Sequence, residues 1–163
     1  MRKLNRKGFT LVELLAVIII LAIVVGITIP AVLSTINSSR QKAGTDAAQI
    51  AANWIDEQYT IVAVDSGSAD SNFKTLCGNN GGTCLSKVVK TTDAGTITSL
   101  GMKSTDVSEV RVKITASGKS CVTVVAASSG AYYVTSGVKD QLYTQGAGCT
   151  SDELKTHLAV SNG

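Results

Sequence analysis

The feature that most constrains this chain is an uncharged segment of membrane length that directly follows a carboxylate near the N-terminus. No charged residue occurs from Leu14 to Ser39, and Glu13 stands at the start of this segment. As a helix, its apolar part from Leu14 to Ile36 would span about 34 Å, enough to cross a bilayer with a little tilt. A carboxylate in a spanning helix is costly to insert and therefore needs a specific reason.

The basic residues of the chain are concentrated in front of this segment. The 163 residues include 15 basic and 12 acidic ones, and four of the basic ones lie within the first eight residues: Arg2, Lys3, Arg6 and Lys7. This positive leader predicts a cytoplasmic N-terminus, with the rest of the chain outside. The remainder has 11 basic and 12 acidic residues. Such a near-neutral body disfavours a general nucleic-acid binder, although a local patch stays open.

Three interpretations of the N-terminal segment compete. A cleaved secretory signal has an apolar region of only about 7 to 15 residues, so this segment is too long for one. A plain signal anchor explains the length and the flanks but leaves Glu13 unexplained. Cleavage between Gly8 and Phe9 would create an amino group on Phe9, about one helical turn from Glu13. The amine and the carboxylate could then neutralise each other, within one chain or between neighbouring chains.

The residues around this cleavage point resemble a known motif. Gly8-Phe9-Thr10-Leu11-Val12-Glu13-Leu14-Leu15 is similar to the processing and assembly motif of type IV pilins. The resemblance implies that a prepilin peptidase cuts after Gly8 and that Phe9 becomes N-methylated. It also implies that Glu13 is the family's assembly carboxylate and that Pro30 is its helix-breaking proline.

The resemblance implies a structural subunit of a type IV pilus, which polymerises into a helical surface filament for adhesion, motility or DNA uptake. Its expected partners are further copies of itself, the prepilin peptidase, the pilus assembly machinery and minor pilins. The subunit would wait in the inner or cytoplasmic membrane as a single-pass protein and then enter the extracellular filament. A pseudopilin of a type II secretion or competence system would share every N-terminal feature and is the alternative.

Gly26 and Pro30 form a weak turn inside the apolar segment. Pro30 cannot donate a hydrogen bond to the carbonyl of Gly26, and glycine is itself a poor helix former. Thr28 or neighbouring helices could satisfy the freed groups in a membrane. The resemblance implies that local melting here would let the helix lengthen and pack in a filament.

Four cysteines follow the apolar segment and none precedes it: Cys77, Cys84, Cys121 and Cys149. An even number on one side favours two disulfides in an oxidising compartment, whereas the spacing lacks the close ligand pairs of structural zinc sites. Three connectivities are open to four cysteines. We favour Cys77 with Cys84, which bracket a glycine-rich tip, and Cys121 with Cys149, which resembles the C-terminal disulfide loop of many type IV pilins.

The pattern predicts an α+β fold of the type IV pilin kind. A single helix is expected from about Phe9 to about Tyr59, with Ile50 and Trp54 of its second half packed on an antiparallel sheet of three to four strands. We expect a leader at 1–8, an apolar helix at 9–36, its amphipathic half at 37–62 and a globular domain at 63–163.

Within the globular domain, the residues between Val64 and Leu85 have the composition of turns rather than of a regular element. Strands are expected at 110–116, 120–127 and 131–135, with turns at 117–118 and 128–130 and a further edge strand near 96–100. Thr150-Ser151-Asp152-Glu153 matches a capping box and predicts a short C-terminal helix that contains His157.

A signal-anchored enzyme or binding protein is the distant alternative. It would need a constellation of catalytic groups, and the chain has one histidine and no glycine-rich phosphate loop after a strand. We therefore expect no catalytic residue, no metal site and no cofactor.

Overall fold

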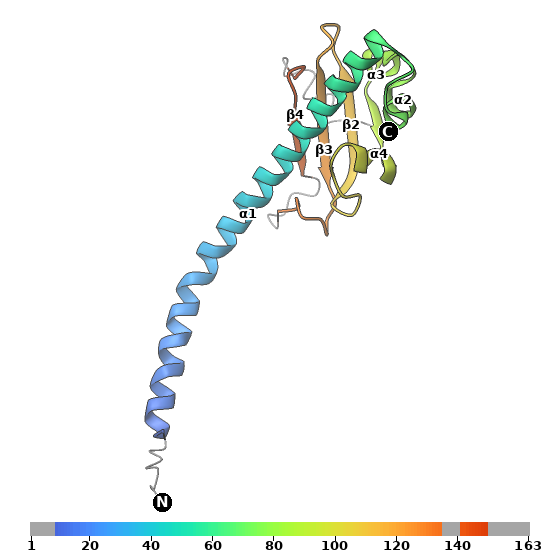
Figure 1. Ribbon diagram of the computed structural model, residues 1–163. Helices are drawn as coiled ribbons and strands as arrows, with labels where there is room; N and C mark the ends of the chain where they lie inside the picture. Colours follow the sequence, from blue (N-terminus) through green and yellow to red (C-terminus); the bar gives the residue numbers. More distant parts are fainter. Residues whose placement is uncertain (1–8, 135–140, 150–163) are drawn as a thin grey trace, which may run out of the picture. The chain divides into compact units, whose positions relative to one another are not determined.

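The computed structural model describes residues 9–134 and 141–149. The chain divides into two compact units, one up to Ser38 and one from Ser39 onward. Helix α1 belongs to both, and all other elements belong to the second unit (Figure 1). The helices are α1 (Leu11–Val64), α2 (Ser71–Cys77), α3 (Gly82–Ser86) and α4 (Ala94–Ser99); the strands are β1 (Val89–Thr91), β2 (Val107–Ile114), β3 (Ser120–Ala126) and β4 (Leu142–Gln145).

The four strands form one antiparallel sheet in the order β1-β2-β3-β4. The second half of helix α1 crosses one face of this sheet (Figure 1). The long N-terminal helix and the antiparallel sheet confirm the predicted α+β class, as in the type IV pilin fold. Helix α1 ends at Val64, five residues beyond the predicted end.

Small residues line the face of helix α1 that meets the sheet. The buried positions of the helix are Gly44, Ala47, Ala48, Ala51, Ala52, Ile55, Gln58 and Val62. The prediction for Ile50 is wrong, because this side chain is 55% exposed. Trp54 is partly buried and meets the ring of Phe73 in α2 edge-on, with the ring centroids 6.2 Å apart. The helix thus presents alanine to the sheet, and its largest side chain packs on α2.

Two contacts show how closely helix α1 approaches the sheet. The hydroxyl of Ser120 at the start of β3 donates to the carbonyl of Ala52 over 2.9 Å. A Cβ added to Gly44 would lie 2.4 Å from the ring of Tyr143 in β4. No residue larger than glycine fits at this position unless the tyrosine ring shifts.

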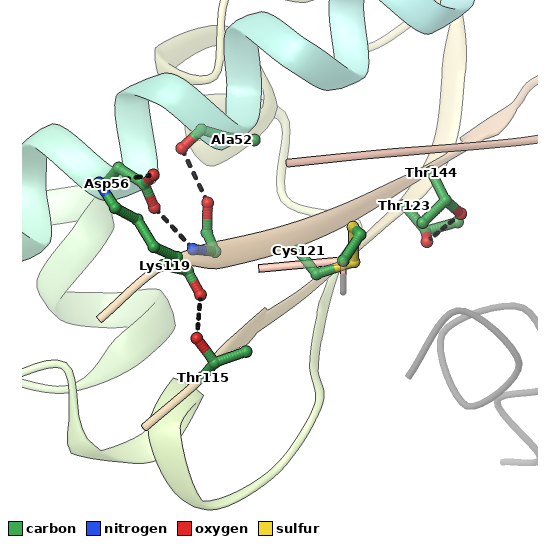
Figure 2. Close-up of a disulfide and its surroundings, with 9 residues drawn as sticks. Ala52, Asp56, Thr115, Lys119, Cys121, Thr123 and Thr144 are labelled. Atoms are coloured by element: carbon green, nitrogen blue, oxygen red, sulfur yellow. Dashed lines mark hydrogen bonds and ion pairs between the residues drawn. A yellow bond between two sulfur atoms is a disulfide. The ribbon is translucent and has the colours of Figure 1, made fainter. Parts of the chain in front are cut away.

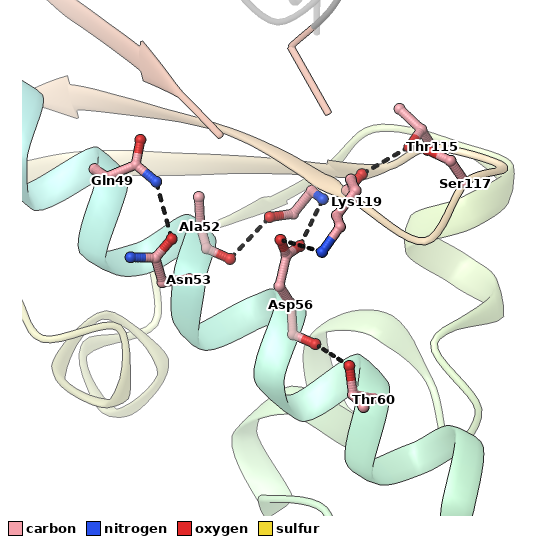
Figure 3. Close-up of polar contacts among 9 residues, drawn as sticks. Gln49, Ala52, Asn53, Asp56, Thr60, Thr115, Ser117 and Lys119 are labelled. Atoms are coloured by element: carbon pink, nitrogen blue, oxygen red, sulfur yellow. Dashed lines mark hydrogen bonds and ion pairs between the residues drawn. The ribbon is translucent and has the colours of Figure 1, made fainter. Parts of the chain in front are cut away.

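Asp56 joins helix α1 to the start of β3 (Figure 3). Its Oδ1 accepts from the backbone N–H of Ser120 over 2.7 Å, and its Oδ2 lies 4.0 Å from Nζ of Lys119. The preceding turn follows the prediction: Gly118 has a positive φ of 75°, and its N–H donates to the carbonyl of Thr115 over 2.9 Å. The side chain of a helix therefore satisfies the first backbone donor of the central strand.

The prediction that residues between Val64 and Leu85 form only turns is wrong, since α2 and α3 lie there. Asp70 caps α2, because its Oδ1 accepts from the N–H of Asn72 over 2.7 Å. The buried residues Phe73, Leu76 and Cys77 follow at spacings of three and four, which places them on one helical face. A cap and an apolar face outweigh the turn-forming composition of this segment.

The edge strand predicted near 96–100 is also wrong, because this segment lies in helix α4 and its C-cap. Asp93 Oδ2 accepts from the N–H of Thr96 over 2.7 Å and from its hydroxyl over 2.9 Å. Ile97 and Leu100 are both buried, three residues apart. The edge strand of the sheet is instead β1, which pairs with β2.

The strand predicted at 131–135 is wrong for 131–134, and Thr135 lies outside the described residues. Side chains bind the backbone of this segment: Arg40 Nη1 donates to the carbonyl of Tyr133 over 2.8 Å. Gln141 pairs with both backbone groups of Val134, over 2.6 and 2.7 Å. The strand that pairs with β3 on this side is β4.

We expect Asp56→Ala to lower the free energy of unfolding of the full chain in detergent micelles by about 1–3 kcal/mol, because it leaves the N–H of Ser120 without its partner. Lys119→Ala is the matched control. It removes only the 4.0 Å ion pair of a lysine that is 57% exposed, and it should cost at most about 1 kcal/mol. Equal losses in thermal or denaturant unfolding would contradict the assigned role of Asp56.

Candidate functional site

The candidate site lies at the start of helix α1 and is built as a reciprocal cap. Thr10 precedes the first helical residue, and Glu13 lies in the first turn. The carboxylate Oε2 of Glu13 accepts from the N–H of Thr10 over 2.9 Å and from its hydroxyl over 2.8 Å. In return, the N–H of Glu13 donates to the hydroxyl oxygen of Thr10 over 3.3 Å. This is the geometry of a capping box, which satisfies two N-terminal backbone donors at once.

Sequence reasoning missed this cap, although its signal was present. The spacing of Thr10 and Glu13 is that of the capping box. Thr150 to Glu153, for which the sequence predicts the same motif, lies outside the described residues together with His157. The structure shows that the carboxylate has a partner within its own chain.

Both bonds to Thr10 use the same carboxylate oxygen. Within residues 9–134 and 141–149, no hydrogen bond is recorded for Oε1 of Glu13. Phe9 is 88% exposed beside this group, and Gly8 lies outside the described residues. The carboxylate is therefore oriented by one oxygen and can accept a further donor with the other.

The apolar side chains that follow are uncovered in the single chain. The large hydrophobic residues from Phe9 to Ile36 are between 42% and 88% exposed. Helix α1 is the one helix in the described part of the chain that is long and apolar enough to cross a membrane. Its exposed apolar surface fits a membrane-anchored protein.

Gly26 and Pro30 lie inside helix α1, which continues through both. The hydroxyl of Thr28 donates to the carbonyl of Val25 over 3.3 Å, and not to that of Gly26, which Pro30 leaves without a helical donor. Both residues lie more than three turns from Glu13, so the structure does not bring them into one site with the carboxylate.

The cysteines form two disulfides, Cys77 with Cys84 and Cys121 with Cys149. The first joins the end of α2 to α3. The second joins β3 to the segment after β4, next to the paired hydroxyls of Thr123 and Thr144 (Figure 2). Among the described residues, no group of three His, Cys, Asp or Glu side chains could hold a metal ion.

In the comparison with protein families, the model of the prokaryotic N-terminal methylation motif matches residues 3–29. The chain carries the type IV prepilin signature. This signature includes Gly8, Phe9, Glu13 and Gly26, and Pro30 follows its last matched residue. No curated protein and no solved structure matches the chain.

The signature indicates a type IV pilin or pseudopilin-like protein. It implies processing by a prepilin peptidase and assembly by a pilus-type machinery, and it suggests a structural rather than an enzymatic role. The cap between Thr10 and Glu13 lies within the matched residues, immediately after the expected cleavage point. The geometry and the signature therefore converge on the first turn of helix α1.

We expect Thr10→Val to accelerate amide hydrogen exchange at Glu13 by roughly 3- to 10-fold in detergent micelles, because the N–H of Glu13 loses its hydroxyl acceptor. Thr10→Ser should restore the wild-type rate. Thr28→Val, which removes a hydroxyl within the same helix, is the control and should leave the exchange of Glu13 unchanged. Unchanged exchange in Thr10→Val would show that the cap does not hold the helix start.

Proposed function

We propose that this chain is the structural subunit of a type IV pilus, cleaved between Gly8 and Phe9 and polymerised through helix α1. The observation that carries the proposal is the capped carboxylate of Glu13, which stands between the cleavage point and an uncovered apolar helix. The segment 9–36 would span the membrane before assembly and form the filament core afterwards. The disulfide-bearing domain would form the outer surface.

Apolar burial alone does not explain why such a helix would leave the membrane. Lipid chains are as apolar as leucine, so moving the helix into a protein core yields little hydrophobic free energy. Packing and polar complementarity must favour the filament. Pairing between Glu13 and the amine of a mature Phe9 would supply the polar part, because opposite charges attract strongly where the effective dielectric constant is low.

The cap makes this pairing geometrically simple. Thr10 holds Oε2 of Glu13, which leaves Oε1 for an ammonium group. The amine of Phe9 does not exist before cleavage, so the complete site would form only in the processed chain. A neighbouring subunit's amine would then set the register between subunits.

A pseudopilin of a secretion or competence system would have the same first turn of helix α1. The disulfide from Cys121 to Cys149 supports a true pilin, because it resembles the C-terminal loop of many type IV pilins. Electron microscopy of cells that express the chain at its native level separates the two, since a pilin gives long surface filaments and a pseudopilin gives none.

We expect Glu13→Ala to abolish filaments while membrane insertion persists, because the apolar segment stays intact. Glu13→Gln keeps a hydrogen-bond acceptor for Thr10 but loses the charge, so it should preserve the helix start and still abolish filaments. The control is Glu57→Ala, an exposed acid further along helix α1. Sheared surface fractions measure filaments and membrane fractions measure insertion. Normal filaments from Glu13→Gln would refute the charge pairing.

Mass spectrometry of surface filaments should show a mature chain that begins with an N-methylated Phe9. Gly8→Val should block cleavage, because the peptidase must accommodate the residue before the scissile bond, and the chain should then retain its leader. Gly26→Ala, a glycine within the helix and away from the cleavage point, should be processed normally. Filaments built from chains that retain the leader would contradict the proposal.

A further inference from the structure

Two cations stand at the start of the second unit, where helix α1 leaves its uncharged segment. Arg40 is the first charged residue after Glu13, and Lys42 follows two residues later. Both belong to the unit that begins at Ser39. The next acid along the helix is Asp46, one turn beyond Lys42. A short positive stretch therefore separates the uncharged segment from the first carboxylate of the second unit.

The uncharged segment ends in polar side chains that are satisfied within the helix. The hydroxyl of Thr35 donates to the carbonyl of Ala31 over 3.1 Å. The hydroxyl of Ser38 donates to the carbonyl of Ser34 over 3.1 Å. A hydroxyl that is bonded in this way costs less to place beside lipid than an unpaired one. The border between the hydrocarbon core and the headgroups therefore fits this part of the helix, just before Arg40.

The helical rise places both cations at the level of the lipid headgroups. With residues 14–36 in the hydrocarbon core, Arg40 and Lys42 lie about 6 and 9 Å beyond its last residue along the helix axis. The headgroup layer on each side of the core is about 5–8 Å thick. Every Cα–Cβ bond of a helix tilts toward the N-terminus, so both side chains lean back into this layer. Residues two apart point to nearly opposite sides of a helix, so the two cations meet headgroups on both sides.

A single contact orients Arg40 and leaves most of its donors for a ligand. Its Nη1 donates to the carbonyl of Tyr133 over 2.8 Å, and no other contact of Arg40 is recorded within residues 9–134 and 141–149. A guanidinium has five N–H donors in a planar fork that matches phosphate oxygens. Lys42 is exposed, and in the same part of the chain it has no recorded ion pair. Both cations are therefore free to bind an anion.

The contact with Arg40 also brings an aromatic residue to this level. Tyr133 is half-buried, and its neighbour Val134 is held by Gln141, whose amide group bonds both backbone groups of Val134 over 2.6 and 2.7 Å. The backbone at 133–134 is thus fixed beside the helix. Tyrosine is enriched at membrane interfaces, where an apolar ring and a polar hydroxyl both find partners. An arginine, a lysine and a tyrosine at one level are typical of a surface that faces headgroups.

We infer that Arg40 and Lys42 bind the phosphate groups of phospholipids in the leaflet that faces away from the cytoplasm, with Tyr133 beside them. The inference rests on the membrane-anchored state of the proposed function. Lipid phosphate is the committed ligand because it is anionic and surrounds the helix at the level of both cations. These contacts would hold the start of the second unit at the bilayer surface and would be lost when the subunit enters a filament.

Solid-state NMR on the full chain in phospholipid bilayers tests the inference. The buffer is free of phosphate, so lipid holds all the phosphorus. With Arg2→Lys and Arg6→Lys, which keep the charge of the leader, the remaining arginines are Arg40 and Arg111. Both are labelled with carbon-13 at Cζ, and rotational-echo double resonance with phosphorus-31 reports which Cζ lies near lipid phosphate. We expect the Cζ signal of Arg40 to dephase and that of Arg111, whose side chain is 13% exposed, to stay.

Variants assign the dephasing to its residue. Arg40→Gln in the same background should abolish it, and the matched control Arg111→Gln should leave it unchanged. With lysine labelled at Cε, Lys42→Gln should reduce the dephased signal. Absence of dephasing at Arg40, or dephasing that persists in Arg40→Gln, would overturn the inference.

An insertion control separates this inference from the proposed function. Magnetisation transfer from lipid acyl protons to labelled Ile18, Ile19 and Ile20 shows that the apolar segment lies in the hydrocarbon core. Transfer to these isoleucines without dephasing at Arg40 would refute the phosphate contact and leave the membrane anchor intact. Absence of both signals would show that the chain does not span the bilayer, and the membrane stage of the proposed function would then fail as well.

Discussion

The close approach of helix α1 to strand β3 is the contact on which the second unit depends. A hydroxyl of the strand reaches a carbonyl of the helix at Ser120 and Ala52, which requires that no large side chain separates the two backbones. The alanines on this face meet that requirement. They also explain why most of the large buried side chains come from the strands and from the short helices around them.

Other parts of the unit follow from the same approach. A Cβ added to Gly146, just after β4, would lie 2.3 Å from the carbonyl oxygen of Ser120 and 3.1 Å from the Cβ of Ala52. The chain can therefore turn toward Cys149 only where glycine permits it. Asp56 fixes the first residue of β3, and the disulfide begins at the next residue, Cys121. The helix, the strand and the disulfide are thus joined within two consecutive residues of β3.

The fold class was predictable from the sequence because its two strongest signals are long or alternating. For the uncharged segment only a helix was expected, and for β2 and β3 only strands. The short elements were missed for local reasons. A capping aspartate converts the β-branched residues Thr96, Ile97 and Thr98 into helix α4. Side chains from distant positions, such as Arg40 and Gln141, bind the backbone at 133–134. Tertiary contacts of this kind leave no periodic signal.

In the candidate site, too, the residues could be predicted from the sequence but their contacts could not. The residues Gly8, Phe9 and Glu13 could be selected from sequence because an acid beside an apolar segment is chemically unusual. The orientation of the carboxylate could not, since it depends on which of two oxygens Thr10 occupies. The orientation of this carboxylate affects the cost of placing Glu13 in lipid. A carboxylate without a local partner would enter lipid with all of its hydration lost, whereas a capped one retains two hydrogen bonds and keeps one oxygen for a later donor. Under the proposed function, the first turn of helix α1 would therefore meet two demands on Glu13: to be tolerated at the membrane boundary and to distinguish a processed neighbour from an unprocessed one.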